Sequence, residues 1–158
     1  MYAAIAILIL IITEYALGRR VGTLTITAPN SRGLVDVYTL SHVIHGFLFY
    51  AILHSLTLAV VVECIWEILE NSPLVINRYR QTASVDYQGD TILNSVSDVA
   101  SMAAGYGIAC IAPIWAVVGL AVVFELFGLW WARDNLTLNV VMLVYPAEKI
   151  KRWQREEL

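Results

Sequence analysis

Long apolar stretches alternate with short polar ones along the chain, and their lengths predict helices. The apolar stretches lie at about residues 1–17, 40–54, 56–70, 91–111 and 114–132. Polar loops at 18–39 and 71–89 separate them, and Pro73 predicts the end of the third helix, because proline disfavours helix at the residue before it. Residues 136–158 are too short in their apolar part to cross a bilayer, so we expect an interfacial tail that ends in a short charged helix.

The composition indicates that these helices lie in a membrane. Hydrophobic residues make up 59% of the chain and charged residues 15%, with a mean hydropathy of +0.68. A span of the bilayer core needs about 20 residues, so the ranges 40–54 and 56–70 are short and would be tilted or lie in a thinned region. The predicted fold is an all-α polytopic membrane helix bundle of about five helices, forming a single integral membrane domain over residues 1–158.

The charged residues predict the orientation of the bundle and exclude one class of partner. All ten Lys and Arg residues lie in the two polar loops or after residue 132. The positive-inside rule therefore predicts cytoplasmic loops, a cytoplasmic C-terminal tail and an N-terminus outside. No basic patch with interleaved aromatic residues is present, so the sequence does not indicate a nucleic-acid partner.

Acidic residues recur at helical spacing inside two of the predicted helices. Glu63, Glu67 and Glu70 are spaced so that their carboxylates share one helix face. The same spacing groups a second set of polar residues, Asp90, Asn94 and Asp98. An acid at the bilayer centre costs on the order of 3 kcal/mol on insertion scales, so these acids predict a paired or functional site.

The predicted topology brings these groups together with two histidines. His42 and His45 begin the second helix, the glutamates end the third helix, and the Asp90–Asp98 set begins the fourth helix, so all three approach one face of the membrane. At about 1.5 Å per residue, His45, Glu63, Asp98 and Glu125 each lie roughly 8 to 12 Å from their helix ends. We therefore predict one buried cluster.

Three kinds of chemistry suit such a cluster, and one structural alternative competes with them. Nitrogen and oxygen ligands from three helices are typical of metal sites in helical bundles. Acid–base work on a phosphorylated or lipid-linked substrate is a second option, with Arg78 and Arg80 holding the phosphate. A proton or ion relay is a third. The alternative is that the buried groups only pair with one another and lock helix packing.

The candidate roles are distributed over the cluster and its flanks. The expected ligands of a divalent metal ion are His42, His45, Glu67, Asp90 and Asp98. The candidate catalytic residues are Glu63, Glu67 and Asp98, and the candidate ligand-binding residues are Arg78, Arg80 and Asn94. The expected partners are the lipid bilayer and a lipid-linked ligand, and both a homo-oligomer and a larger membrane complex are compatible with the sequence. Whether the protein is an enzyme, or a non-catalytic structural or accessory subunit, stays open.

Four stretches of the chain resemble a known family. They are DVYTLSHVIHGFLFY at 36–50, ECIWEILENSPLVINRYR at 63–80, DYQGDTILNSVSD at 86–98 and RDNLTLNVVMLVYPAEKIKRWQ at 133–154. They are similar to the uncharacterised protein family 0314, also called domain of unknown function 2585. The resemblance implies a multi-pass protein of the bacterial inner membrane and assigns no activity.

The N-terminal part departs from that family, and a fainter likeness points to another. Family members usually have a cysteine after the first helix, whereas GRRVGTLTITAPNS has none, and many have a basic N-terminus, which would reverse the predicted orientation. The fainter likeness is to VanZ-like membrane proteins and implies a link to cell-envelope lipid or peptidoglycan chemistry. The matching positions would be His45, Glu63 or Glu67, Arg78, Asp90 and Asn94.

Overall fold

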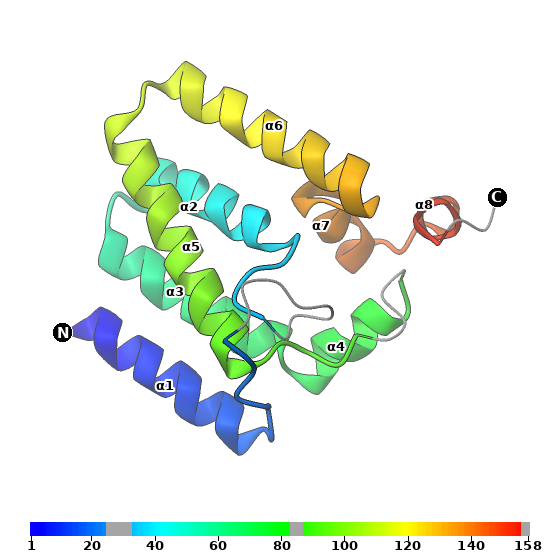
Figure 1. Ribbon diagram of the computed structural model, residues 1–158, viewed down its shortest axis with the longest axis horizontal. Helices are drawn as coiled ribbons and strands as arrows, with labels where there is room; N and C mark the ends of the chain where they lie inside the picture. The colour runs from blue at the N-terminus through cyan, green and yellow to red at the C-terminus, as the bar shows by residue number, and fades with distance from the viewer. Residues whose placement is uncertain (25–32, 83–86, 156–158) are drawn as a thin grey trace.

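The protein is a bundle of α-helices (Figure 1). The computed structural model describes residues 1–24, 33–82 and 87–155, and within these ranges it has eight helices and no strand. The helices are α1 (Tyr2–Ala16), α2 (Thr39–Leu53), α3 (Leu56–Glu70), α4 (Pro73–Arg80), α5 (Ile92–Ile111), α6 (Ile114–Ala132), α7 (Leu136–Val144) and α8 (Glu148–Gln154). The predicted all-helical class is therefore confirmed, and α1, α2, α3, α5 and α6 cover the five expected ranges.

The prediction of a loop at 71–89 is wrong over Pro73–Arg80, because these 8 residues form helix α4. Pro73 ends one helix and also begins the next, since it occupies the first turn of α4, where its missing N–H costs no hydrogen bond. The Ser72 hydroxyl caps this helix by accepting the backbone N–H of Val75 at 3.5 Å. Arg78 and Arg80 consequently lie on a helix beside the bundle rather than in a loop.

The predicted interfacial tail consists of two helices, and the first of them folds back against α6. Residues 156–158 of that tail lie outside the described residues. A Cβ atom on Gly128 would lie 2.8 Å from the carbonyl oxygen of Asp134, so only glycine lets the turn after α6 lie this close. The Glu125 carboxylate then accepts the backbone N–H groups of Leu136 and Thr137 at 3.0 and 3.2 Å. Glu125 therefore caps α7, and the structure does not bring it to the cluster.

Helices α2 and α5 make the closest contact in the bundle. A Cβ atom on Gly46 would lie 2.1 Å from the backbone oxygen of Met102, and one on Gly105 would lie 2.1 Å from that of Val43. Two glycines on facing helices thus allow the backbones to touch, as small residues do at helix interfaces in membranes. This contact sets the distance between α2 and α5, which both carry residues of the site.

Helix α3 completes the site from the other side, where it packs against α1, α2 and α5. The buried apolar core between these helices is formed by Leu10, Ala59, Val60, Cys64, Val99, Met102 and Tyr106. A second buried cluster joins α2, α5 and α6 and contains Ile44, Phe47, Ala109 and Val117. The polar faces of α2, α3 and α5 therefore meet beside these two apolar clusters.

Most of the helix ends that are joined to basic loops lie at one end of the bundle. Figure 1 shows α4 beside the C-terminal ends of α1 and α3, near the N-terminal ends of α2 and α5. Backbone hydrogen bonds join the first turn of α5 to the segment after α1, from Ile92 N–H to the oxygen of Arg20 at 2.9 Å and from Leu93 N–H to that of Val21 at 3.0 Å. The Arg19 guanidinium donates to the backbone oxygen of Gln88 at the same end.

Among the described helices, α6 alone is both long and apolar enough to cross a bilayer by itself. Helices α1 and α2 are apolar but have 15 residues each, and α5 has 20 residues with several polar ones among them. The polytopic arrangement of about five spanning helices therefore stays a prediction.

Candidate functional site

The predicted cluster forms where α2, α3 and α5 meet. His42, Glu63, Glu67, Asn94 and Asp98 are all buried, and both glutamates have no exposed surface. The spacing of four residues on α3 and on α5 puts each pair on one face, and the close α2–α5 contact brings the histidines to the same place. Three helices thus contribute ionisable side chains to one interior region.

Glu63 holds both histidines. Its Oε1 lies 2.6 Å from Nδ1 of His42 and 3.1 Å from Nδ1 of His45, and its Oε2 lies 3.2 Å from the same nitrogen of His45. An ionised carboxylate only accepts hydrogen bonds, so each imidazole donates through Nδ1–H. This bonding pattern assigns the tautomers and leaves Nε2 of each ring available to another group.

The other two buried acids of the site, Glu67 and Asp98, make no hydrogen bond to a described histidine. Glu67 Oε1 lies 3.5 Å from Nδ1 of His42, and Asp98 Oδ2 lies 3.9 Å from Nε2 of the same ring. A ligand atom from each of His42, Glu67 and Asp98 lies within 4.8 Å of the other two. Within the part of the chain that the structure describes, neither carboxylate oxygen of Glu67 has a hydrogen-bond partner. An ionised carboxylate in this state costs several kcal/mol, so the geometry calls for a cation or a proton.

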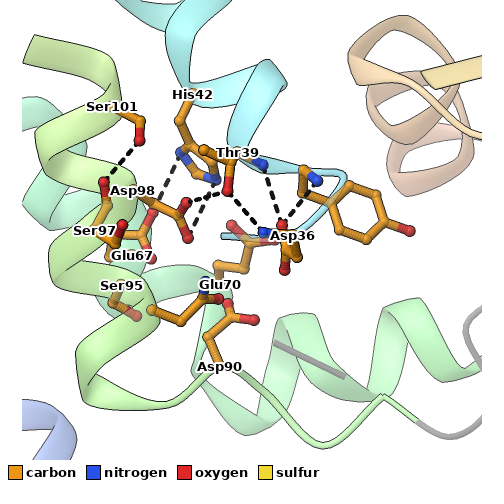
Figure 2. Close-up of polar contacts among 12 residues, drawn as sticks. Asp36, Thr39, His42, Glu67, Glu70, Asp90, Ser95, Ser97, Asp98 and Ser101 are labelled. Atoms are coloured by element: carbon orange, nitrogen blue, oxygen red, sulfur yellow. Dashed lines mark hydrogen bonds and ion pairs between the residues drawn. The ribbon is translucent and has the colours of Figure 1, made fainter. Parts of the chain in front are cut away.

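A turn before α2 fixes the position of Asp98. Asp36 Oδ1 accepts the backbone N–H groups of Tyr38 and Thr39 at 2.8 and 3.1 Å, and Thr39 Oγ1 accepts that of Asp36 at 3.0 Å. The Thr39 hydroxyl in turn donates to Asp98 Oδ1 at 3.4 Å (Figure 2). The reciprocal pair resembles a capping box and ties the start of α2 to the acid on α5.

A small cavity of about 30 Å³ lies directly beside the cluster. Its lining includes the acids Asp36, Glu70, Asp90 and Asp98 and no Lys or Arg among the described residues. Asn94 also lines it, is 1% exposed, and has no described hydrogen-bond partner for either amide atom. A space of this size takes one water molecule or one ion.

Tyrosines close the outer side of this cavity. The Tyr87 hydroxyl donates to Asp90 Oδ2 at 2.8 Å, and the Tyr79 hydroxyl lies 2.9 Å from both Glu70 Oε1 and Asn139 Oδ1. Burial raises the pKa of both phenols, and the neighbouring carboxylates raise it further. Both phenols therefore stay protonated and serve as donors.

The remaining predicted site residues lie around the cluster or away from it. Two groups of described residues have ligand atoms within 4.8 Å of one another, His42–Glu67–Asp98 and His42–His45–Glu63. Asp90 lines the cavity but belongs to neither of these metal-ligating groups, and its backbone N–H donates to Asn71 Oδ1 at 2.6 Å. Arg78 donates to the backbone oxygens of Leu143 and Val144 at the end of α7, at 2.8 and 3.1 Å. Arg80 Nε donates to the backbone oxygen of Tyr87 at 2.7 Å. The structure does not bring either arginine to the cluster.

Sequence reasoning missed a second buried network centred on Glu14. This residue is 0% exposed, and its Oε1 accepts hydrogen bonds from Asn71 Nδ2 and Ser95 Oγ, each at 2.8 Å. Asn71 Nδ2 also donates to the backbone oxygen of Glu67 at 3.2 Å, which links this network to the main site. A single acid inside the otherwise apolar first helix is the sequence signal that indicates it.

The fold and site define an all-helical protein with a buried histidine–carboxylate cluster, and comparisons with known proteins place it in a family. Residues 22–156 match the family described as a protein of unknown function, DUF2585. The chain belongs to this family, which confirms the resemblance found in the sequence. No solved structure matches the chain.

Its relatives carry the matching family name UPF0314. The chain is 54% identical to UPF0314 protein R03235 of Rhizobium meliloti, over 81% of this chain and 71% of the relative. It is 45% identical to UPF0314 protein Atu8092 of Agrobacterium fabrum, over 96% and 87% of the two chains. A UPF0314 protein of Novosphingobium aromaticivorans is 48% identical over 81% and 73%. None of these names states an activity.

Proposed function

We propose that this chain is a multi-pass protein of the bacterial inner membrane, with α1, α2, α3, α5 and α6 in the bilayer. The outward surface supports this proposal. In α6, only 11% of the most apolar 18-residue window is buried, and Leu126 and Trp130 are 60% and 75% exposed. Apolar side chains such as Leu8, Ile12 and Ile65 are also exposed on α1 and α3. Exposed apolar surface on this scale is rare in water and ordinary in lipid.

The orientation follows from the basic end of the bundle. Arg78 and Arg80 lie on α4, and Arg19 and Arg80 both donate to the segment before α5, at Gln88 and Tyr87. The positive-inside rule assigns such a basic end to the cytoplasm. The buried cluster lies towards the same end, because it is formed by the first turns of α2 and α5 and the last turns of α3. An ion entering the site would therefore come from the cytoplasmic side.

We further propose that His42, Glu67 and Asp98 hold a divalent metal ion. The observation that carries this proposal is the Glu67 carboxylate, which is fully buried and accepts no hydrogen bond from the described residues. A cation between Glu67, Asp98 and Nε2 of His42 would neutralise both acids and occupy the free ring nitrogen. One imidazole with two carboxylates favours Zn²⁺, Mn²⁺ or Fe²⁺ over Ca²⁺ and Mg²⁺, which prefer oxygen ligands only.

Glu63 and His45 fit a supporting role in this site. They are already hydrogen-bonded to each other, and the 2.6 Å distance from His42 Nδ1 to Glu63 Oε1 is short, as expected where the acceptor is ionised. A carboxylate that fixes the tautomer and orientation of a ligating imidazole is a usual feature around bound metals. Asn94 lies beside the cavity, where its amide oxygen would add a further ligand.

Metal analysis of purified protein tests this proposal. Protein in detergent micelles is stripped with a chelator, loaded with Zn²⁺ or Mn²⁺, and measured for bound metal. We expect about one ion per chain, and a loss of at least about 10-fold in affinity for Glu67→Gln and Asp98→Asn. Glu63→Gln should weaken binding by about 10- to 100-fold through the orientation of His42. Glu70→Gln, on the same helix as Glu67 but outside both metal-ligating groups, is the matched control and should bind normally.

The competing interpretation is a structural or accessory membrane subunit whose polar groups lock helix packing. It predicts that loading with metal leaves the melting temperature unchanged and that no ion co-purifies. It also predicts that Glu67→Leu is as stable as the wild type or more stable, because apolar residues often replace buried ionic groups without loss. That combination of results would refute the metal proposal.

A further inference from the structure

A groove of about 240 Å³ runs along the outer side of the cluster. It lies between α2, α3 and α7, and part of its wall is apolar. The apolar side chains are Phe49, Val62, Trp66, Leu136 and Val140. Val140 is 51% exposed, so this wall reaches the outer surface of the molecule, which is itself apolar around α3 and α6.

The inner end of the groove is polar and touches the site. His45 and Glu63 line it, together with the hydroxyl and amide groups of Ser41, Tyr79 and Asn139. The His45 side chain is 16% exposed, and its Nδ1 is held by both oxygens of Glu63. Nε2 of His45 is therefore a hydrogen-bond acceptor that a molecule in the groove can reach.

The charge of the groove selects the polar group it can accept. Glu63 and Glu70 line it, and no Lys or Arg does so among the described residues. The guanidinium groups of Arg78 and Arg80 instead contact backbone oxygens of α7 and of the segment before α5. The wall thus suits a hydrocarbon chain, whereas the inner end suits a donor without negative charge and repels a phosphate.

We infer that the groove binds a single-chain amphiphile whose head group is a hydroxyl or an ammonium that donates to His45 Nε2 or to Glu63. This inference rests on the proposed position of the bundle in the bilayer, from which a hydrocarbon chain enters between α3 and α7. It does not require the metal. The ligand class is therefore a long-chain alcohol or amine, in place of the phosphorylated head group that Arg78 and Arg80 led us to expect.

Photolabelling in lipid nanodiscs tests the inference. The probe is dodecanol with a diazirine near the end of its chain, and mass spectrometry locates the adducts on the protein. Adducts are expected on α2, α3 and α7 beside Phe49, Val62 and Val140. Unlabelled dodecanol or dodecylamine should displace them at saturation, with dodecyl phosphate at least about 10-fold weaker. Comparison of the alcohol with the amine shows which head group binds.

Four variants make the result interpretable. Val62→Trp fills the groove and should abolish saturable labelling, whereas Val122→Trp, on the outward face of α6, should leave it unchanged. His45→Asn should reduce competition by dodecanol about 10-fold, which corresponds to about 1.4 kcal/mol. Equal, non-saturable labelling of the groove and of α6, or equal competition by dodecyl phosphate, would overturn the inference. Glu67→Gln should lose metal and keep the labelling, so failure of the groove and failure of the metal site are distinguishable.

Discussion

Adding one methyl group at Gly105 should damage both the fold and the site, because this residue lies in the closest helix contact. A Cβ atom there would lie 2.1 Å from the backbone oxygen of Val43, whereas ordinary contacts begin at 3.4 Å. Helices α2 and α5 would have to separate by more than about 1 Å, and neither can relieve the clash by a rotamer change. Overpacking of this kind costs about 1–3 kcal/mol, which lowers the melting temperature by about 2–12 °C in a domain of this size.

The separation should also reach the cluster. His42 lies on α2 and Asp98 on α5, and the Thr39–Asp98 hydrogen bond is already 3.4 Å long. Gly105→Ala should therefore weaken metal binding together with stability. Gly107→Ala is the matched control on the same helix, since a Cβ atom at Gly107 meets nothing within 4 Å and should stabilise the helix by up to about 1 kcal/mol.

The assay can use the protein's own thiols. Cys64 is buried in the core and Cys110 is exposed, so a Cys110→Ser background leaves one thiol that a fluorogenic maleimide reaches only on unfolding. We would compare melting curves of both glycine variants in this background, and metal affinity in parallel. Equal melting temperatures and affinities for Gly105→Ala and Gly107→Ala would refute the close-contact argument.

Three further predictions concern the surroundings of the site. Glu125→Ala removes the side-chain acceptor from the first turn of α7 and should cost about 0.5–2 kcal/mol, seen as faster amide hydrogen exchange over Leu136–Val144; unchanged exchange would contradict the capping role. Burial raises the pKa of Asp134 to about 6 from an ordinary 3.8, so the folded state binds its proton more tightly and stability should fall as pH rises from about 4 to above 6. Asp134→Asn should remove that pH dependence, which is worth at most about 3 kcal/mol. If the variant and the wild type show the same pH profile of melting temperature, Asp134 is not its cause. Asn71→Ala deprives Glu14 of a donor and should cost about 1–3 kcal/mol in thermal unfolding, whereas Asn71→Asp should not restore the loss, because aspartate has no N–H to donate.

The two buried networks together explain why so many polar groups are tolerated in an apolar bundle. Asn71 connects them, since its side chain donates to Glu14 and to the backbone oxygen of Glu67. Helix α3 therefore carries polar contacts to α1 on one side and to α2 on another. The Glu14 carboxylate has two donors and that of Glu63 has two histidines, whereas the Glu67 carboxylate has no hydrogen bond among the described residues, which is why the proposed ion belongs beside Glu67.

The sequence by itself determined the helical class and the residues that share a face. Apolar runs of helical length require helices wherever backbone groups leave water, and a spacing of four residues aligns Glu63 with Glu67 and Asn94 with Asp98 in any α-helix. The local sequence also indicates the start of α4, because serine followed by proline is typical of a helix N-terminus as well as of the end of the preceding helix.

Only the tertiary structure decided which of these faces meet and which polar groups have partners. Nothing local to Glu125 distinguishes it from Glu67, yet the carboxylate of Glu125 caps α7, whereas that of Glu67 is buried without a hydrogen bond to any described residue. Likewise, the sequence alone makes Arg78 a candidate ligand for phosphate, whereas in the folded protein its guanidinium donates to two backbone oxygens at the end of α7. The physical reason is that periodicity fixes the direction of a side chain relative to its own helix axis. Its partners depend on the rotation and separation of neighbouring helices, which here follow from the contact of Gly46 and Gly105 with the opposite backbones.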